Sequence, residues 1–161
     1  MSTIATEHTL LEHLLYLLNG DGAHADFAAV VNNLPAALQG KRPQGAQYSP
    51  WELLEHMRIT QRDVLDLMLD PAHTSPEFPA GYWPSAPAPA NDSWAKSVKE
   101  FQADFKEILA LIAGRSRELL SPLPHASDQT ILRRLMMLAD HTSYHLGQLV
   151  LVRKLLGAWP E

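Results

Sequence analysis

Residues 49–69 read SPWELLEHMRITQRDVLDLML and carry the signals of one long helix. Ser49 suits the N-cap, Pro50 the first helical position and Glu52 the third, which together make a capping-box pattern. Pro71 follows the stretch and forbids its continuation. We therefore expect a single helix of about 31 Å, at 1.5 Å per residue.

One imidazole interrupts the apolar face of this predicted helix. The inward stripe consists of Leu53, His56, Met57, Thr60, Val64, Leu67 and Met68. His56 thus falls among residues expected to be buried, where both ring nitrogens need partners. Glu55 is its neighbour in sequence but points about 100° away around the helix, so we do not expect it to be a ligand.

Two further histidines share a face of the last predicted helix. This helix is expected to begin after Ser127 or Asp128 and to run to Leu156, before Gly157. The spacing of four residues between His141 and His145 brings both imidazoles to one face, a turn apart. The apolar stripe at positions 135, 138, 142, 145, 149 and 152 includes His145 and has His141 at its edge.

These three inward histidines have two interpretations. A metal ion would satisfy all three at once, and three neutral nitrogens would leave positions open for water or substrate. Alternatively, each is a hydrogen-bonded core residue, and an HxxxH pair is often simply a surface pair. On the residues alone both interpretations stay open. Imidazole suits zinc, nickel, iron or copper without choosing among them.

Other polar residues are weaker candidates for a site. His24 follows the turn-like stretch 20–23 and is a candidate fourth ligand, general base or substrate contact, or else a loop-capping residue. Gln148 is a candidate hydrogen-bond partner of His145, although an exposed polar role is favoured. The remaining histidines, at predicted surface or loop positions, are His8, His13, His73 and His125.

The rest of the chain is also helical in pattern. Helices are predicted around residues 10–18, before Gly20, briefly over 26–33, and from 91 or 92 to 119. No strand is convincing. The proline-rich segment 71–90 contains Tyr82 and Trp83, so we expect an ordered crossover loop that packs its aromatic residues on the bundle, the alternative being a disordered linker. Residues 1–161 are predicted to form one all-α four-helix-bundle domain.

Composition limits the functional classes. The chain has 161 residues, 46% hydrophobic and 19% charged, with a net charge of -5, so it lacks the basic surface that nucleic-acid binding requires. The pairs Arg133–Arg134 and Arg153–Lys154 are interpreted as solvated helix positions. With no cysteine, any thiol chemistry needs an external thiol. Neither a signal peptide nor a membrane span is apparent, so a cytoplasmic protein is expected.

Two segments carry a family resemblance. Residues 49–63 resemble the second helix of DinB-like proteins, and residues 140–149 (DHTSYHLGQL) resemble their final-helix signature of HxxxH followed by Gly-Gln. Residues 20–27 and the Gly81–Pro84 piece resemble one branch of the same superfamily. The resemblance covers nearly the whole chain.

The resemblance implies a fold and a metal site. It implies an up-down-down-up bundle with a long crossover, a homodimer, and a divalent transition metal (zinc, nickel or iron) held by His56, His141 and His145. It also implies a relationship to transferases and isomerases that use mycothiol, bacillithiol or glutathione. Three functions therefore stay open: a metal-dependent transferase joining a small-molecule thiol to an electrophile, a metal-dependent hydrolase, and a non-enzymatic stress-related metal-binding or dimerisation module.

Overall fold

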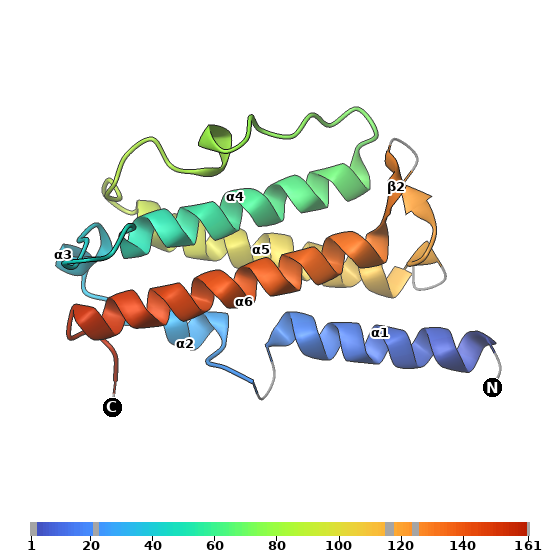
Figure 1. Ribbon diagram of the computed structural model, residues 1–161, viewed down its shortest axis with the longest axis horizontal. Helices are drawn as coiled ribbons and strands as arrows, with labels where there is room; N and C mark the ends of the chain where they lie inside the picture. Colours follow the sequence, from blue (N-terminus) through green and yellow to red (C-terminus); the bar gives the residue numbers. More distant parts are fainter. Residues whose placement is uncertain (1–2, 21–22, 115–117, 124–125, 161) are drawn as a thin grey trace.

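A computed structural model describes residues 3–20, 23–114, 118–123 and 126–160. The long helices within these residues are α1 (Thr3–Asn19), α4 (Pro50–Leu69), α5 (Ser93–Gly114) and α6 (Ile131–Leu155). The shorter elements are α2 (Phe27–Val31), α3 (Ala36–Gln39), the 3₁₀ turn η1 (Ala80–Tyr82), β1 (Pro122–Leu123) and β2 (Ala126–Thr130). Helices α1 and α6 run in one direction and α4 and α5 in the other (Figure 1). The predicted up-down-down-up, all-α bundle is confirmed.

The start of α4 is held by the predicted capping box. The Ser49 side chain accepts a hydrogen bond from the Glu52 N–H at 3.2 Å, and the Glu52 carboxylate accepts one from the Ser49 N–H at 2.8 Å. Arg42 pairs with the same carboxylate. Because these bonds satisfy two free donors of the first turn, the helix begins at Pro50 as expected.

The connection between α5 and α6 differs from the prediction. Helix α5 ends at Gly114, whereas residue 119 was expected; of the extra residues, 115–117 lie outside the described part of the chain. Leu119 is buried, and its carbonyl accepts a hydrogen bond from the Leu132 N–H at 2.9 Å. The burial of Leu119 and its hydrogen bond to Leu132 direct the chain back toward α6. A helix α5 that continued to residue 119 would prevent this reversal.

A short hairpin was also missed before α6. Strands β1 and β2 pair antiparallel, with Pro122 opposite Thr130. The expected cap at Ser127 or Asp128 is therefore wrong, because both residues lie in β2. Thr130 is the N-cap instead, and its hydroxyl accepts from the Arg133 N–H at 3.1 Å. A β-branched residue suits both the end of a strand and an N-cap.

The apolar core forms two clusters, one at each end of the bundle. One cluster joins α2, the first halves of α4 and α5 and the last half of α6, and includes Leu54, Phe101 and Leu146. The other joins α1, the second halves of α4 and α5 and the start of α6, and includes Val64, Ile108 and Leu138. His141 and His145 lie along α6 between the two clusters.

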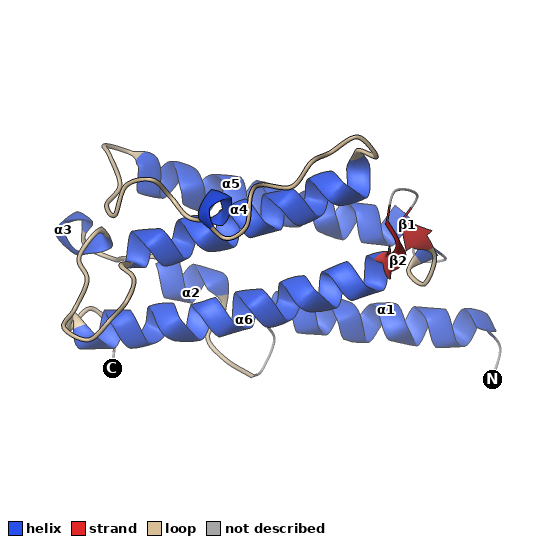
Figure 2. Cartoon of the chain, turned by 45° about the horizontal axis from the view of Figure 1, so that its top comes forward, coloured by secondary structure: helices blue, strands red, loops and turns tan. Residues whose placement is uncertain are grey.

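The proline-rich loop after α4 is an ordered crossover that returns along the outer side of this helix (Figure 2). The indole N–H of Trp51 donates to the Ala86 carbonyl at 3.1 Å, and the Ser49 hydroxyl donates to the Pro87 carbonyl at 2.8 Å. The loop is thus ordered, as predicted, and these two bonds fix it to the start of α4. No helix in the described part of the chain is long and apolar enough to cross a membrane.

Arg153 is not a solvated position. Its side chain is buried, with 2% of the residue exposed, and donates to the carbonyls of Val30 at 2.6 Å, Asn32 at 3.0 Å and Ala158 at 2.8 Å. Those carbonyls end α2 and follow α6, so no helical N–H satisfies them. The neighbouring Lys154 is exposed, as expected.

Removing this guanidinium leaves several buried carbonyls unpaired. We expect Arg153→Ala to lower the free energy of unfolding by about 2–4 kcal/mol. The matched substitution Lys154→Ala on the next residue is expected to change it by less than about 0.5 kcal/mol. Urea unfolding followed by circular dichroism measures both; equal values for the two variants would contradict a structural role for Arg153.

Candidate metal centre

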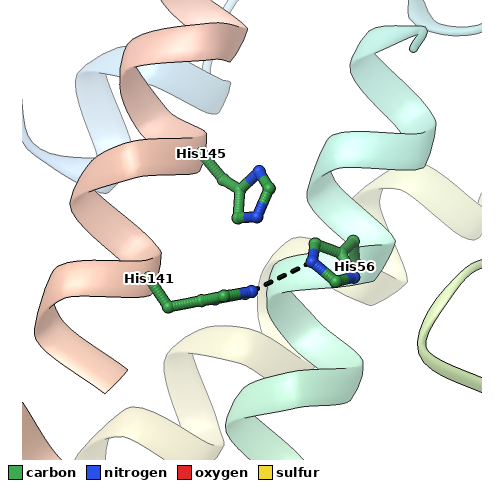
Figure 3. Close-up of side chains that lie close together, drawn as sticks. All are labelled: His56, His141 and His145. Carbon is green, nitrogen blue, oxygen red and sulfur yellow. Dashed lines mark hydrogen bonds between the residues drawn. The ribbon is translucent and has the colours of Figure 1, made fainter. Parts of the chain in front are cut away.

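Three imidazoles converge between α4 and α6. His56 extends from α4, and His141 and His145 extend from α6, so that the three rings face a common point (Figure 3). Their candidate ligand nitrogens lie within 4.8 Å of one another. The periodicity of each helix fixed which faces carry these residues, and the packing of α4 on α6 brings all three together.

Two contacts fix the orientation of His56. Its Nδ1–H donates to the Tyr82 carbonyl at 2.8 Å, and its ring stacks on Trp83 with centroids 3.9 Å apart and planes at 1°. Trp83 in turn stacks on Tyr48 at 4.1 Å. Because a carbonyl only accepts hydrogen bonds, the proton of a neutral His56 is on Nδ1 and Nε2 carries a lone pair.

His145 is oriented in the same way by its own helix. Its Nδ1–H donates to Oε1 of Gln148 at 2.7 Å. The structure thus gives Gln148 the role that sequence analysis considered less favoured. The residue lies three positions after His145, a spacing that brings side chains together on a helix surface. The second lone pair at the centre is therefore Nε2 of His145.

His141 is left with an unsatisfied nitrogen. Its Nε2 lies 2.9 Å from Nε2 of His56, while its Nδ1 is buried and has no hydrogen-bond partner among the described residues. Since Nε2 of His56 carries a lone pair, His141 donates to it in the metal-free state. Three imidazoles whose candidate ligand nitrogens lie within 4.8 Å of one another are a donor set that fits a divalent transition metal.

Burial keeps the three rings neutral. It lowers the pKa of His141 to about 3, with smaller contributions from His145 and His56. It also lowers the pKa of His145 to about 4, against the opposing hydrogen bond with Gln148, and lowers the pKa of His56. Near pH 7 the three imidazoles therefore present lone pairs rather than positive charges, as metal binding requires.

A buried carboxylate holds the loop that orients His56. Asp63 accepts hydrogen bonds from the Tyr82 hydroxyl at 2.7 Å and from Nε2–H of His73 at 2.8 Å. The sequence pattern did not single out Asp63, and it predicted a surface or loop position for His73. One signal was available: Asp63 is seven residues after His56, about two turns, and thus on the same face of α4. Tyr82 joins the two residues, since its hydroxyl binds Asp63 and its carbonyl binds His56.

The other sequence candidates lie elsewhere. His24 is exposed; its Nε2 lies 3.1 Å from Oγ of Ser143, and it lines a cavity to which none of the three clustered histidines contributes. Glu55 pairs with Arg58 at 2.7 Å, which agrees with the expectation that it is not a ligand. His13 is exposed on α1, and His125 lies outside the described residues.

Comparison with known proteins identifies a family. The model of the DinB superfamily matches residues 20–149, a segment that contains all three clustered histidines. No curated protein and no solved structure matches the chain.

The lowered pKa values predict acid sensitivity of the metal-free protein. In the unfolded chain these histidines take up protons near pH 6.5, whereas folded His141 does so near 3. Between these values the unfolded state binds more protons, so stability falls as the pH falls. One histidine contributes a slope of up to about 1.4 kcal/mol per pH unit.

We expect His141→Asn to remove most of the contribution of one histidine to the pH dependence of stability. Urea unfolding of the metal-free wild type and variant between pH 4 and 6.5 measures the two slopes. His13→Asn, which alters an exposed histidine, is the matched control. Parallel curves for the wild type and His141→Asn would contradict the burial of a neutral imidazole at this position.

Loss of the Asp63 carboxylate should loosen the crossover loop. We expect Asp63→Asn to lower the free energy of unfolding by about 1–3 kcal/mol, because an amide replaces a charged acceptor of two hydrogen bonds. Glu77→Gln, an isosteric change at an exposed position of the same loop, should change it by less than about 0.5 kcal/mol. Urea unfolding provides the comparison, and equal effects would show that the carboxylate does not fix the loop.

Proposed function

Because this chain belongs to the DinB superfamily, we propose that His56, His141 and His145 hold a divalent transition metal in an enzyme that joins a small-molecule thiol to an electrophile. The observation that carries the proposal is the convergence of three neutral imidazoles, whose candidate ligand nitrogens lie within 4.8 Å of one another. The acceptors opposite the rings of His56 and His145 hold their protons on Nδ1, so that each Nε2 carries a lone pair directed at the centre.

The donor set favours an open site over a closed structural one. The group of candidate ligands found in the described residues consists of three histidines, with no carboxylate. Three protein nitrogens are typical of catalytic sites, in which further positions belong to water or substrate. When bound there, a divalent metal lowers the pKa of a coordinated thiol, so that the thiolate is the nucleophile.

The chain itself positions the donors and excludes water. The Tyr82 carbonyl and the Gln148 side chain hold the protons of His56 and His145 on Nδ1. Trp83 covers one face of His56 and keeps solvent from it. The protein has no cysteine, so the thiol comes from outside, and mycothiol, bacillithiol and glutathione are the types that the family relationship suggests.

A non-enzymatic role is the second candidate, and one observation favours it. The donors come from two helices, α4 and α6, and lie between the two core clusters. A metal at this point would join the helices where apolar packing is interrupted. In that case metal binding would add stability by mass action and would catalyse nothing.

Metal content tests the shared premise. Elemental analysis of protein purified without nickel resin is expected to give about one metal ion per chain. His56→Ala, His141→Ala and His145→Ala should each lose most of it, because each removes one of three ligands, whereas the exposed His13→Ala should retain it. Metal-free wild type under every loading condition would overturn the proposal.

Activity separates the two candidates. Metal-loaded protein is incubated with a chromogenic electrophile and, in turn, glutathione, bacillithiol and mycothiol. We expect at least one thiol to react faster than with the metal-free protein or His141→Ala. Uncatalysed rates with every thiol would refute the transferase; an accompanying metal-dependent rise in melting temperature would support the bracing role, and ester hydrolysis would indicate a hydrolase.

A further inference from the structure

A cavity lies beside α6, away from the three histidines. It has a volume of about 190 Å³ and is lined by the end of α1 and by α2, α4, α5 and α6. Its apolar wall includes Leu17, Phe27, Phe101, Phe105, Leu138 and Leu146. The residues lining it include none of the three clustered histidines, so its occupant would not contact the candidate metal centre.

The cavity opens at the rim that holds the exposed His24, and its volume suits a small molecule. Protein interiors are close-packed, and voids much larger than a water molecule are few. An apolar cavity of about 150 Å³ is large enough to hold benzene. Phe27 and Phe101 stack at one wall with centroids 4.0 Å apart and planes at 13°. Aromatic walls favour an aromatic occupant, which packs in offset or edge-to-face geometry.

A polar pair is built into the rim of this cavity. The Nδ1–H of His24 donates to the Ala25 carbonyl at 3.0 Å, so Nε2 accepts, and the Ser143 hydroxyl donates to it at 3.1 Å. Ser143 Oγ, its proton engaged, keeps acceptor capacity toward the cavity that both residues line. An occupant would therefore bind Ser143 through an O–H or N–H donor.

The backbone before His24 is shaped for this arrangement. Gly20 has a φ of +71°, a conformation that side chains other than glycine rarely adopt. A Cβ there would lie 3.0 Å from Cε1 of His24. Glycine thus allows α1 to end while the imidazole of His24 lies close to Gly20 and pairs with Ser143 of α6.

We propose that this cavity binds a small molecule consisting of a single aromatic ring with one O–H or N–H donor, which Ser143 accepts while His24 fixes the direction of the serine hydroxyl. His24 then acts on a separate ligand site rather than as a fourth ligand or general base at the three histidines. The site stands on its own geometry and does not require the proposed transferase activity.

Phenol and benzene are suitable probes, because they share a ring and differ in the donor. Each is titrated into the full-length protein and followed by ¹H–¹⁵N NMR. Phenol is expected to shift the amide resonances of Phe27, Phe105 and Ser143 and to bind more tightly than benzene. Shifts confined to His56 and its neighbours, or none with either probe at millimolar concentration, would overturn the proposal.

Two variants separate the hydrogen bond from the cavity. Ser143→Ala should weaken phenol binding about five-fold, the effect of one neutral hydrogen bond, and leave benzene binding unchanged. Ala139→Leu, at a buried lining position, should abolish binding of both probes by filling the space. If Ala139→Leu does not fold, the test rests on phenol and benzene binding to the wild type and to Ser143→Ala. Equal phenol affinities of these two proteins would refute the role of Ser143.

Discussion

The burial of three imidazoles between α4 and α6 is the constraint on which the surrounding structure depends. An imidazole in an apolar environment needs a partner for each nitrogen, and two charged rings at this separation would repel one another. The structure meets this demand one ring at a time, with the Tyr82 carbonyl for His56 and the Gln148 amide for His145. Among the described residues, Nδ1 of His141 has no hydrogen-bond partner. The three candidate ligand nitrogens lie within 4.8 Å of one another, and this convergence is the physical basis for proposing a metal at the site.

The crossover loop supplies one of these hydrogen-bond partners, the Tyr82 carbonyl. Its proline residues remove backbone donors and prevent helix formation, so the loop must be fixed by other contacts. Those contacts come from α4: Asp63 binds Tyr82, Trp51 binds Ala86, and His56 stacks on Trp83. The same helix therefore supplies one imidazole of the centre and the groups that hold the partner of this imidazole. Helices α4 and α5 are parallel, so a long loop must connect them. The same loop supplies the Tyr82 carbonyl that orients His56.

Hydrogen-bonded polar groups also join separate segments away from the centre. Arg153 lies inside the bundle, and carbonyls at the end of α2 and beyond α6 accept its hydrogen bonds. Ser143 and His24 pair across the rim of the cavity beside α6. Three polar clusters thus interrupt the apolar packing at separate places, and each joins segments distant in sequence. Polar groups in this small bundle specify how the helices are placed relative to one another.

The sequence determined the local features of this protein, because these depend on residues close together in the chain. Helical periodicity and caps predicted the four long helices, the capping box at Ser49 and the faces that carry the three histidines. Tertiary structure decided the rest. The strand before α6 depends on pairing with β1, and the burial of Arg153 depends on carbonyls more than a hundred residues earlier. Asp63 gained its role only when the loop returned along α4. Periodicity thus identified which histidines point inward, whereas only the packing of α4 on α6 decided that they meet.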